Sequence, residues 1–130
     1  RMIKLVYCIR KRADMSFEDF DRYWWEEHGP KVTSVAKAIG AVRYVQSHLC
    51  APELNKQLRE GRGLAEPYDG VTEVWWESEA EMREQSATAE GIEAMTMLLK
   101  DESTFIDFEQ SRVFITEEKE VFDLRSESAS

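Results

Sequence analysis

Two kinds of hydrophobic pattern alternate along this chain, and their order limits the fold more than any other feature. Residues 2–10, 41–50, 70–77 and 110–116 are rich in β-branched and aromatic side chains, as β-strands are. In two of the intervening stretches, apolar residues recur every three or four positions, as on one face of a helix. The pattern therefore predicts a chain that mixes strands and helices.

The first helical stretch begins after Ser16, whose hydroxyl can accept a hydrogen bond from the new helix while Asp19 returns the bond in a capping box. Phe17, Phe20 and Trp24 then recur at helical spacing. We therefore expect a helix that packs this apolar face against a sheet.

A Gly29-Pro30 pair interrupts this stretch, because proline has no backbone N–H and disfavours a helical residue before it. An apolar stripe restarts at Val32 and ends at Gly40, a suitable C-terminal cap. The sequence therefore predicts two helices separated at the Gly-Pro pair.

A later helical region opens at Ser78, with Glu81 in position to complete another capping box, and residues 89–100 continue or restart it. Its expected core face consists of Ile92, Met95, Leu98 and Leu99. The order of elements is the split βαβ, or ferredoxin-like, motif. We predict an α+β fold, a ferredoxin-like βαββαβ domain with a four-stranded antiparallel sheet.

The stretch between the second and third strands, residues 51–68, is polar and rich in glycine. At most one helical turn is expected there, around residues 54–58. We interpret the stretch as a long mobile loop, and long loops in small domains are often lids over a site.

Size and charge narrow the possible partners. A length of 130 residues fits one domain, and 26 acidic against 17 basic side chains argue against nucleic acid as a partner. No apolar run has the length of a membrane span, and the N-terminus lacks the pattern of a secretory signal. We therefore expect a cytoplasmic protein with no membrane partner.

Three of the predicted strands are apolar on both faces, although helices can cover only one face of such a sheet. A second copy of the chain is the simplest cover for the other face. We predict a homodimer, a dimeric α+β barrel, in which the two sheets pack face to face.

His28 continues the stripe of Phe20 and Trp24, so its imidazole should point inward. One interpretation is a core histidine that bonds a backbone carbonyl and fixes the Gly-Pro corner. The other is a proton carrier, because imidazole alone has an unperturbed pKa close to neutral pH.

Tyr44, Gln46 and His48 share one face of the second strand, where they could line the floor of a pocket. The alternative is an edge strand with a wetted face. A phenol, an amide and an imidazole in one row are the polar groups that a small-molecule site requires.

Glu73 lies on the third strand beside two tryptophans, where burial would raise its pKa and suit it to acid or base chemistry. Alternatively, it pairs with an arginine such as Arg43 or Arg112. Strand alternation places Trp75 on the face of Glu73 and Trp76 on the other face, so one of the two should face the pocket. Tyr7 and Trp24 are further candidates for an apolar pocket wall.

The chain shows no glycine-rich phosphate cradle, nucleophile elbow or zinc-ligand spacing. His28, His48 and Glu73 suffice in number for an iron site, but their spacing does not require one. We therefore predict no metal and no cofactor.

Three segments together, residues 20–30 (FDRYWWEEHGP), 43–48 (RYVQSH) and 68–78 (YDGVTEVWWES), resemble the EthD family of dimeric α+β-barrel proteins. The resemblance covers residues 2–118 and leaves 119–130 as a C-terminal extension with an expected disordered end. It implies a dimer with a pocket between sheet and helices in each subunit. It also implies that His28 and Tyr44 lie in that pocket, as their counterparts do in related muconolactone-type isomerases.

The leading hypothesis is a cofactor-independent enzyme acting on a small apolar aromatic, polyketide-like or lactone molecule. His28 would transfer a proton, while Tyr44, His48 and Glu73 orient a carbonyl or phenol oxygen. The expected reaction is of the isomerase, dehydratase, cyclase or monooxygenase type. The alternatives are a binding or carrier module for a hydrophobic metabolite and a haem-binding oxidoreductase.

Overall fold

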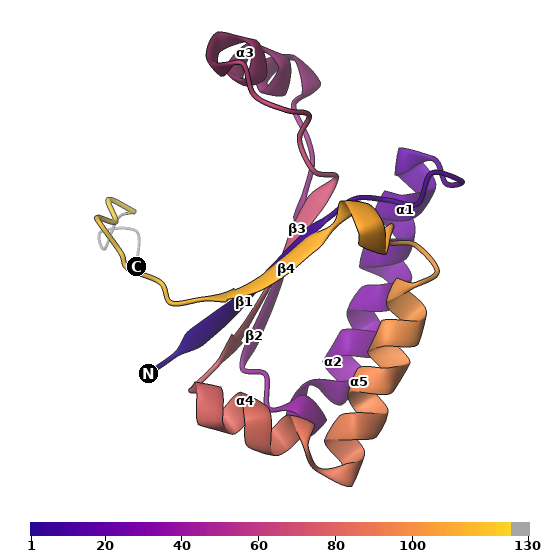
Figure 1. Cartoon of the computed structure of the whole chain (residues 1–130), viewed down its shortest axis with the longest axis vertical. Helices are drawn as coiled ribbons and strands as arrows, with labels where there is room; N and C mark the ends of the chain where they lie inside the picture. The colour runs from indigo at the N-terminus through magenta and orange to yellow at the C-terminus, as the bar shows by residue number, and fades with distance from the viewer. Residues whose placement is uncertain (126–130) are drawn as a thin grey trace.

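The computed structural model describes residues 1–125 and contains one antiparallel sheet. Its strands are β1 (Ile3–Ile9), β2 (Arg43–His48), β3 (Gly70–Trp76) and β4 (Arg112–Thr116), in the order β2-β3-β1-β4. Helices cover one face of this sheet, while on the other face Figure 1 shows only the C-terminal segment. The predicted α+β, ferredoxin-like βαββαβ fold is confirmed. The tail expected to be disordered, residues 125–130, lies outside the described part of the chain except for Arg125.

Two successive helices and the turn that joins them cross the sheet after β1. They are α1 (Phe17–Tyr23), a π-helical turn η1 (Trp24–His28) and α2 (Gly29–Ile39). The Ser16 hydroxyl accepts the predicted N-terminal hydrogen bond from the Asp19 N–H at 3.1 Å.

The expected break at Gly29-Pro30 is wrong, because helical backbone angles continue through Gly29, with φ −51° and ψ −53°. The Gly29 N–H bonds the Trp24 carbonyl, five residues back, which is the pattern of a π-helix. The wider turn leaves one backbone N–H position without a regular helical acceptor. Pro30 has no backbone N–H, so no hydrogen bond is lost there. The helical backbone therefore continues past the proline, and the helix stays packed on the sheet.

The second helical region consists of α4 (Glu79–Ser86) and α5 (Ala89–Glu102), capped by the hydroxyls of Ser78 and Thr88. The sequence left open whether the helix continues or restarts, and in the structure it restarts at Ala89. The expected core face of α5 is wrong in part. Ile92 is 56% exposed and Leu99 58%, while the buried face consists of Gly91, Ala94, Leu98 and Asp101.

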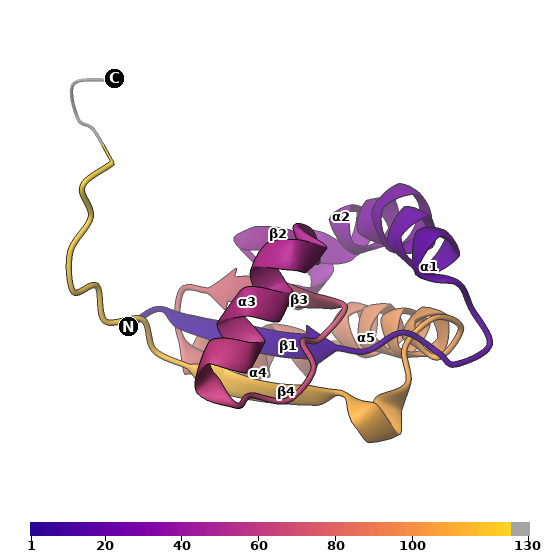
Figure 2. The same cartoon turned by 90° about the horizontal axis from the view of Figure 1, so that it is seen from above.

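Helix α3 (Pro52–Arg62) occupies most of the stretch expected to be a loop. It has no buried residue, and Figure 1 shows it beyond the end of the sheet, so that in Figure 2, seen from above, it lies in front of the strands. Pro52 suits a first helical turn, and residues such as Leu, Lys, Gln and Arg favour the helix without tertiary contacts. The two glycines that suggested a loop lie at its end.

The core between sheet and helices has two parts. One contains Val32, Ile39, Val74, Trp76, Ala94 and Leu98. The other contains Ile9, Phe20, Trp24, Phe105 and Ile106. The opposite face of the sheet carries apolar side chains with no helix over them, namely Val6, Val45, Val71 and Phe114. Within residues 1–125, no helix combines the length and apolarity needed to span a membrane.

Candidate functional site

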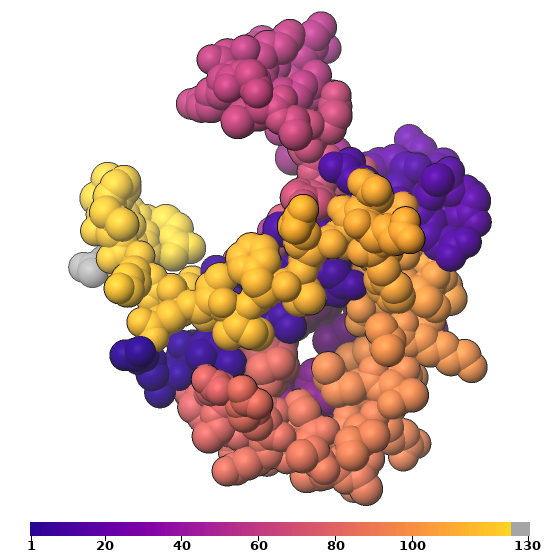
Figure 3. Space-filling view, viewed as in Figure 1, coloured from indigo at the N-terminus to yellow at the C-terminus, as the bar shows by residue number. Residues whose placement is uncertain are grey.

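A cavity of about 450 Å³ lies between the sheet and the helices, where the two parts of the core meet. Its walls come from all four strands and from η1, α2 and α5, and they are mainly apolar. Figure 3 shows the surface hollowed between β4 and α5, on the side where Met95, Leu99 and Val113 form part of the lining. The few polar groups on the walls include His28, Tyr44 and Glu102.

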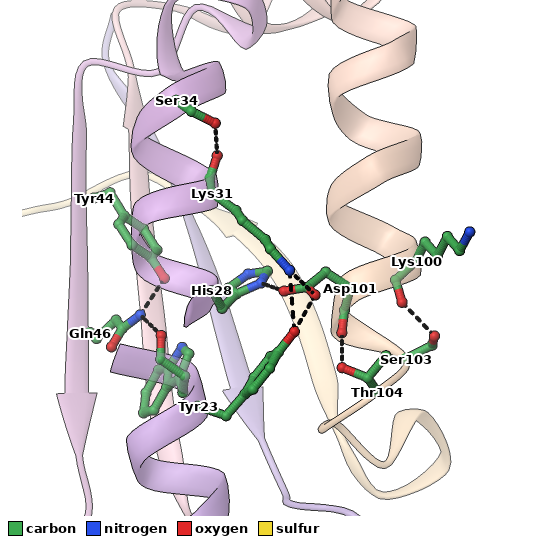
Figure 4. Close-up of polar contacts among 11 residues, drawn as sticks. Tyr23, His28, Lys31, Ser34, Tyr44, Gln46, Lys100, Asp101, Ser103 and Thr104 are labelled. Atoms are coloured by element: carbon green, nitrogen blue, oxygen red, sulfur yellow. Dashed lines mark hydrogen bonds and ion pairs between the residues drawn. The ribbon is translucent and has the colours of Figure 1, made fainter. Parts of the chain in front are cut away.

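His28 and Asp101 form a buried pair beside this cavity, with 2.7 Å between His28 Nδ1 and Asp101 Oδ2 (Figure 4). The two side chains come from η1 and from the last turn of α5, and they are 6% and 8% exposed. Asp101 also accepts hydrogen bonds from the Tyr23 hydroxyl at 2.5 Å and from Lys31 Nζ at 2.7 Å. An ionised Asp101 holds the proton on Nδ1 and leaves Nε2 free to accept another.

Burial sets the protonation states of this pair. It lowers the pKa of His28, although the hydrogen bond to Asp101 acts in the opposite direction. For Asp101, burial alone would raise the pKa, but hydrogen bonds from Lys31, Tyr23 and His28 outweigh it and lower the pKa. Near neutral pH the site therefore holds a neutral imidazole against a carboxylate, which is the arrangement of a general base and its orienting partner.

The three polar residues predicted on one strand face are joined in the structure. Gln46 Nε2 donates to the Tyr44 hydroxyl at 2.6 Å and to the Trp24 carbonyl at 2.9 Å, while Gln46 Oε1 lies 2.8 Å from His48 Nε2. Tyr44 reaches the cavity, but Gln46 and His48 are not part of its lining. His48 instead stacks on Trp24, with ring centroids 4.3 Å apart, and its Nδ1 contacts Asp21.

Glu73 and Trp75 lie on the face of the sheet that has no helices, as their register with Lys4 and Val6 requires. Glu73 Oε2 pairs with Lys4 Nζ at 2.7 Å, not with either arginine considered from the sequence. The structure therefore does not bring these two candidates to the cavity. Trp76 is the tryptophan of the pair that lines it.

Tyr7 and Trp24 also line the cavity, so five of the nine residues singled out in the sequence border one space. They are Tyr7, Trp24, His28, Tyr44 and Trp76, while Gln46 lies behind the wall and donates a hydrogen bond to Tyr44. The two histidines and Glu73 do not converge. Within residues 1–125, no three His, Cys, Asp or Glu side chains lie together in a way that could hold a metal ion.

The sequence reasoning missed the acidic residues of α5. Asp101 follows Ala94 by seven positions and Leu98 by three, so it continues the buried stripe of the helix. A carboxylate on an apolar stripe requires a partner, and this signal could have marked Asp101 as a candidate site residue. Glu102, which lines the cavity, has its pKa raised to about 7 by burial.

Comparisons with known proteins agree with this fold. A family model described as the EthD domain matches residues 12–109. Among curated proteins, none matches the chain. A solved structure of an ethyl tert-butyl ether D (EthD) family protein from Bacillus halodurans C-125 has a TM-score of 0.60 and 17% identity, and the match covers 92% of this chain and 100% of that one.

Two other solved structures share the fold at lower identity. A dimeric protein of unknown function and ferredoxin-like fold from Bacteroides fragilis NCTC 9343 has a TM-score of 0.57 and 10% identity, covering 89% of this chain and 95% of that one. SnoaB, a cofactor-independent oxygenase from Streptomyces nogalater, has a TM-score of 0.53 and 12% identity, covering 96% and 98%. These similarities show the fold.

Proposed function

The chain belongs to the EthD family, and from this premise we propose that it is a cofactor-independent enzyme that moves a proton on a small, largely apolar molecule bearing a carbonyl or phenol. The substrate classes are aromatic, polyketide-like or lactone compounds. The observation that carries the proposal is the buried His28–Asp101 pair on the wall of a mainly apolar cavity. The fold shared with a cofactor-independent oxygenase supports it.

In the proposed mechanism, Nε2 of neutral His28 removes a proton from the substrate, and Asp101 stabilises the imidazolium that results. The electron pair of the broken bond moves onto the carbonyl or phenol oxygen. Gln46 donates a hydrogen bond to the Tyr44 hydroxyl oxygen. The Tyr44 hydroxyl proton is therefore available for a hydrogen bond to the substrate oxygen that becomes negatively charged. Isomerisation, dehydration and oxygenation can all begin with this enolate-like intermediate.

The hydrogen bonding of His28 favours an enzyme over a carrier. A carrier requires only apolar walls and satisfied polar groups, and histidines bonded to the backbone would suit it. His28 is bonded instead to a carboxylate that fixes one tautomer, and it lies on the cavity wall. This geometry serves a proton acceptor.

We also propose that the protein is a homodimer whose sheets pack through their helix-free faces, as the dimeric neighbour of the same fold suggests. Phe114 on that face is 48% exposed in the single chain. Native mass spectrometry should give twice the mass of the 15.1 kDa chain. A monomer at micromolar concentration would contradict the proposal.

Proton transfer can be tested without the natural substrate. β-Tetralone, an enolisable aromatic ketone, exchanges its acidic hydrogens for deuterium in heavy water, and proton NMR follows the loss of signal. We expect the protein to accelerate this exchange beyond an equal concentration of free imidazole. His28→Gln should abolish the acceleration, since it removes the base.

The chain offers a matched comparison in its second histidine. His48→Gln should retain the accelerated exchange, because His48 does not line the cavity. Thermal melting of both variants checks that they fold. Exchange no faster than with free imidazole, or exchange lost in His48→Gln and kept in His28→Gln, would contradict the proposed function.

A further inference from the structure

A second carboxylate projects into the cavity from the helix turn that supplies Asp101. Glu102 ends α5 and lines the cavity, whereas the neighbouring Asp101 is held by His28, Tyr23 and Lys31. Within residues 1–125, none of the side chains that line the cavity belongs to a lysine or arginine. The charge of Glu102 therefore has no cation on the cavity wall to balance it.

The groups around Glu102 are phenols, an imidazole and another carboxylate. Tyr7 of β1, Tyr44 of β2 and His28 of η1 border the same space as Glu102. On its own helix, the charge of Asp101 lies close enough to raise the pKa of Glu102 further, beyond the effect of burial. Near neutral pH, Glu102 therefore exchanges between a carboxylic acid and an unbalanced carboxylate.

We propose that Glu102 is the specificity residue of the cavity: it binds a hydroxyl or carbonyl oxygen of a neutral aromatic ligand and excludes ligands that carry a carboxylate. This inference rests on the cavity of the proposed function but not on its chemistry. The carboxylate form accepts a hydrogen bond from a hydroxyl, and the acid form donates one to a carbonyl. A ligand carboxylate would lose its water beside a second carboxylate with no cation to pair with.

Two probes with the same ring system separate these cases. β-Naphthol stays neutral and β-naphthoate stays ionised between about pH 6 and pH 8. Isothermal titration calorimetry with the wild-type protein should show that β-naphthol binds at least about tenfold more tightly than β-naphthoate. The difference should widen as the pH rises through about 7, since Glu102 then loses its proton.

Glu102→Gln removes the charge and keeps the shape. It should tighten β-naphthoate binding by about tenfold at pH 8 and abolish the pH dependence of the preference. Glu93→Gln, on the exposed side of the same helix, should change neither affinity. Loss of a buried, unbalanced charge does not threaten folding, so Glu102→Gln is a usable variant.

Three results would overturn the proposal: equal wild-type affinity for the two probes, an unchanged preference in Glu102→Gln, or no binding of β-naphthol. Failure of the proposed function looks different. If β-tetralone exchange is not catalysed but the preference for β-naphthol depends on Glu102, the cavity selects neutral ligands without moving a proton.

Discussion

At the scale of single residues, two adjacent carboxylates on α5 have pKa values shifted in opposite directions. Asp101 accepts three hydrogen bonds, two of them from groups that carry or can carry positive charge, and its pKa is lowered. Within residues 1–125, Glu102 receives no hydrogen bond from a lysine, arginine or histidine, and burial raises its pKa to about 7. One turn of helix thus provides a fixed anion beneath His28 and a titrating group on the cavity wall.

The raised pKa of Glu102 makes a prediction for stability. The folded protein keeps the Glu102 proton to a higher pH than the unfolded chain does, so stability is lost as the pH rises through about 7. Glu102→Gln should therefore be more stable than the wild type at pH 8, by about 1–2 kcal/mol after allowance for partial exposure, and should lose this advantage at about pH 4.

Urea denaturation of both proteins at the two pH values measures this difference. Glu93→Gln controls for the loss of one negative charge on α5, and its stability should show no such pH dependence. An advantage of Glu102→Gln that is equal at both pH values would mean that the residue does not titrate in the folded state as described.

At the scale of elements, the strands and most helices could be predicted because burial imposes a period on the sequence. β3, for example, is buried along most of its length, and its run of Val74, Trp75 and Trp76 reflects that burial. α3 was missed because no residue in it is buried, its helical apolar spacing is limited to Leu54 and Leu58, and nearby glycines favoured a loop.

The π-helical turn was missed for a different reason. Proline normally ends a helix, and only the wider η1 turn, whose Trp24 carbonyl also accepts a hydrogen bond from Gln46, lets the helix continue. The tolerance of Pro30 therefore depends on Gln46 of β2, a residue outside the helical segment. It also keeps Trp24 and His28 in one rigid element that faces the cavity.

Parts of the candidate site were similarly open to sequence reasoning. The stripe from Phe20 to His28 and the alternation on β2 placed His28 and Tyr44 on the inner side, where the structure has them. Alternation separated Trp75 from Trp76 but could not say which face the helices cover. The pairing of His28 with Asp101 joins residues 73 positions apart, and no local pattern reveals such a contact.

At the scale of the whole molecule, the sheet divides the chain into two environments. One face, under the helices, holds the cavity and its polar groups. The other face carries the Lys4–Glu73 ion pair among apolar side chains and is the surface proposed to meet a second copy. The proposed ligand site and the proposed dimer surface thus lie on opposite sides of the four strands.

The most direct test of this account uses the two histidines as reporters of where a ligand binds. The chain has only these two, His28 on the cavity wall and His48 outside the lining, stacked on Trp24. NMR signals of both imidazoles should be followed while β-tetralone is added to the wild-type protein. We predict large, saturating shifts for His28 and small ones for His48. Shifts confined to His48, or none in either ring at saturating ligand, would contradict the assignment of the cavity as the functional site.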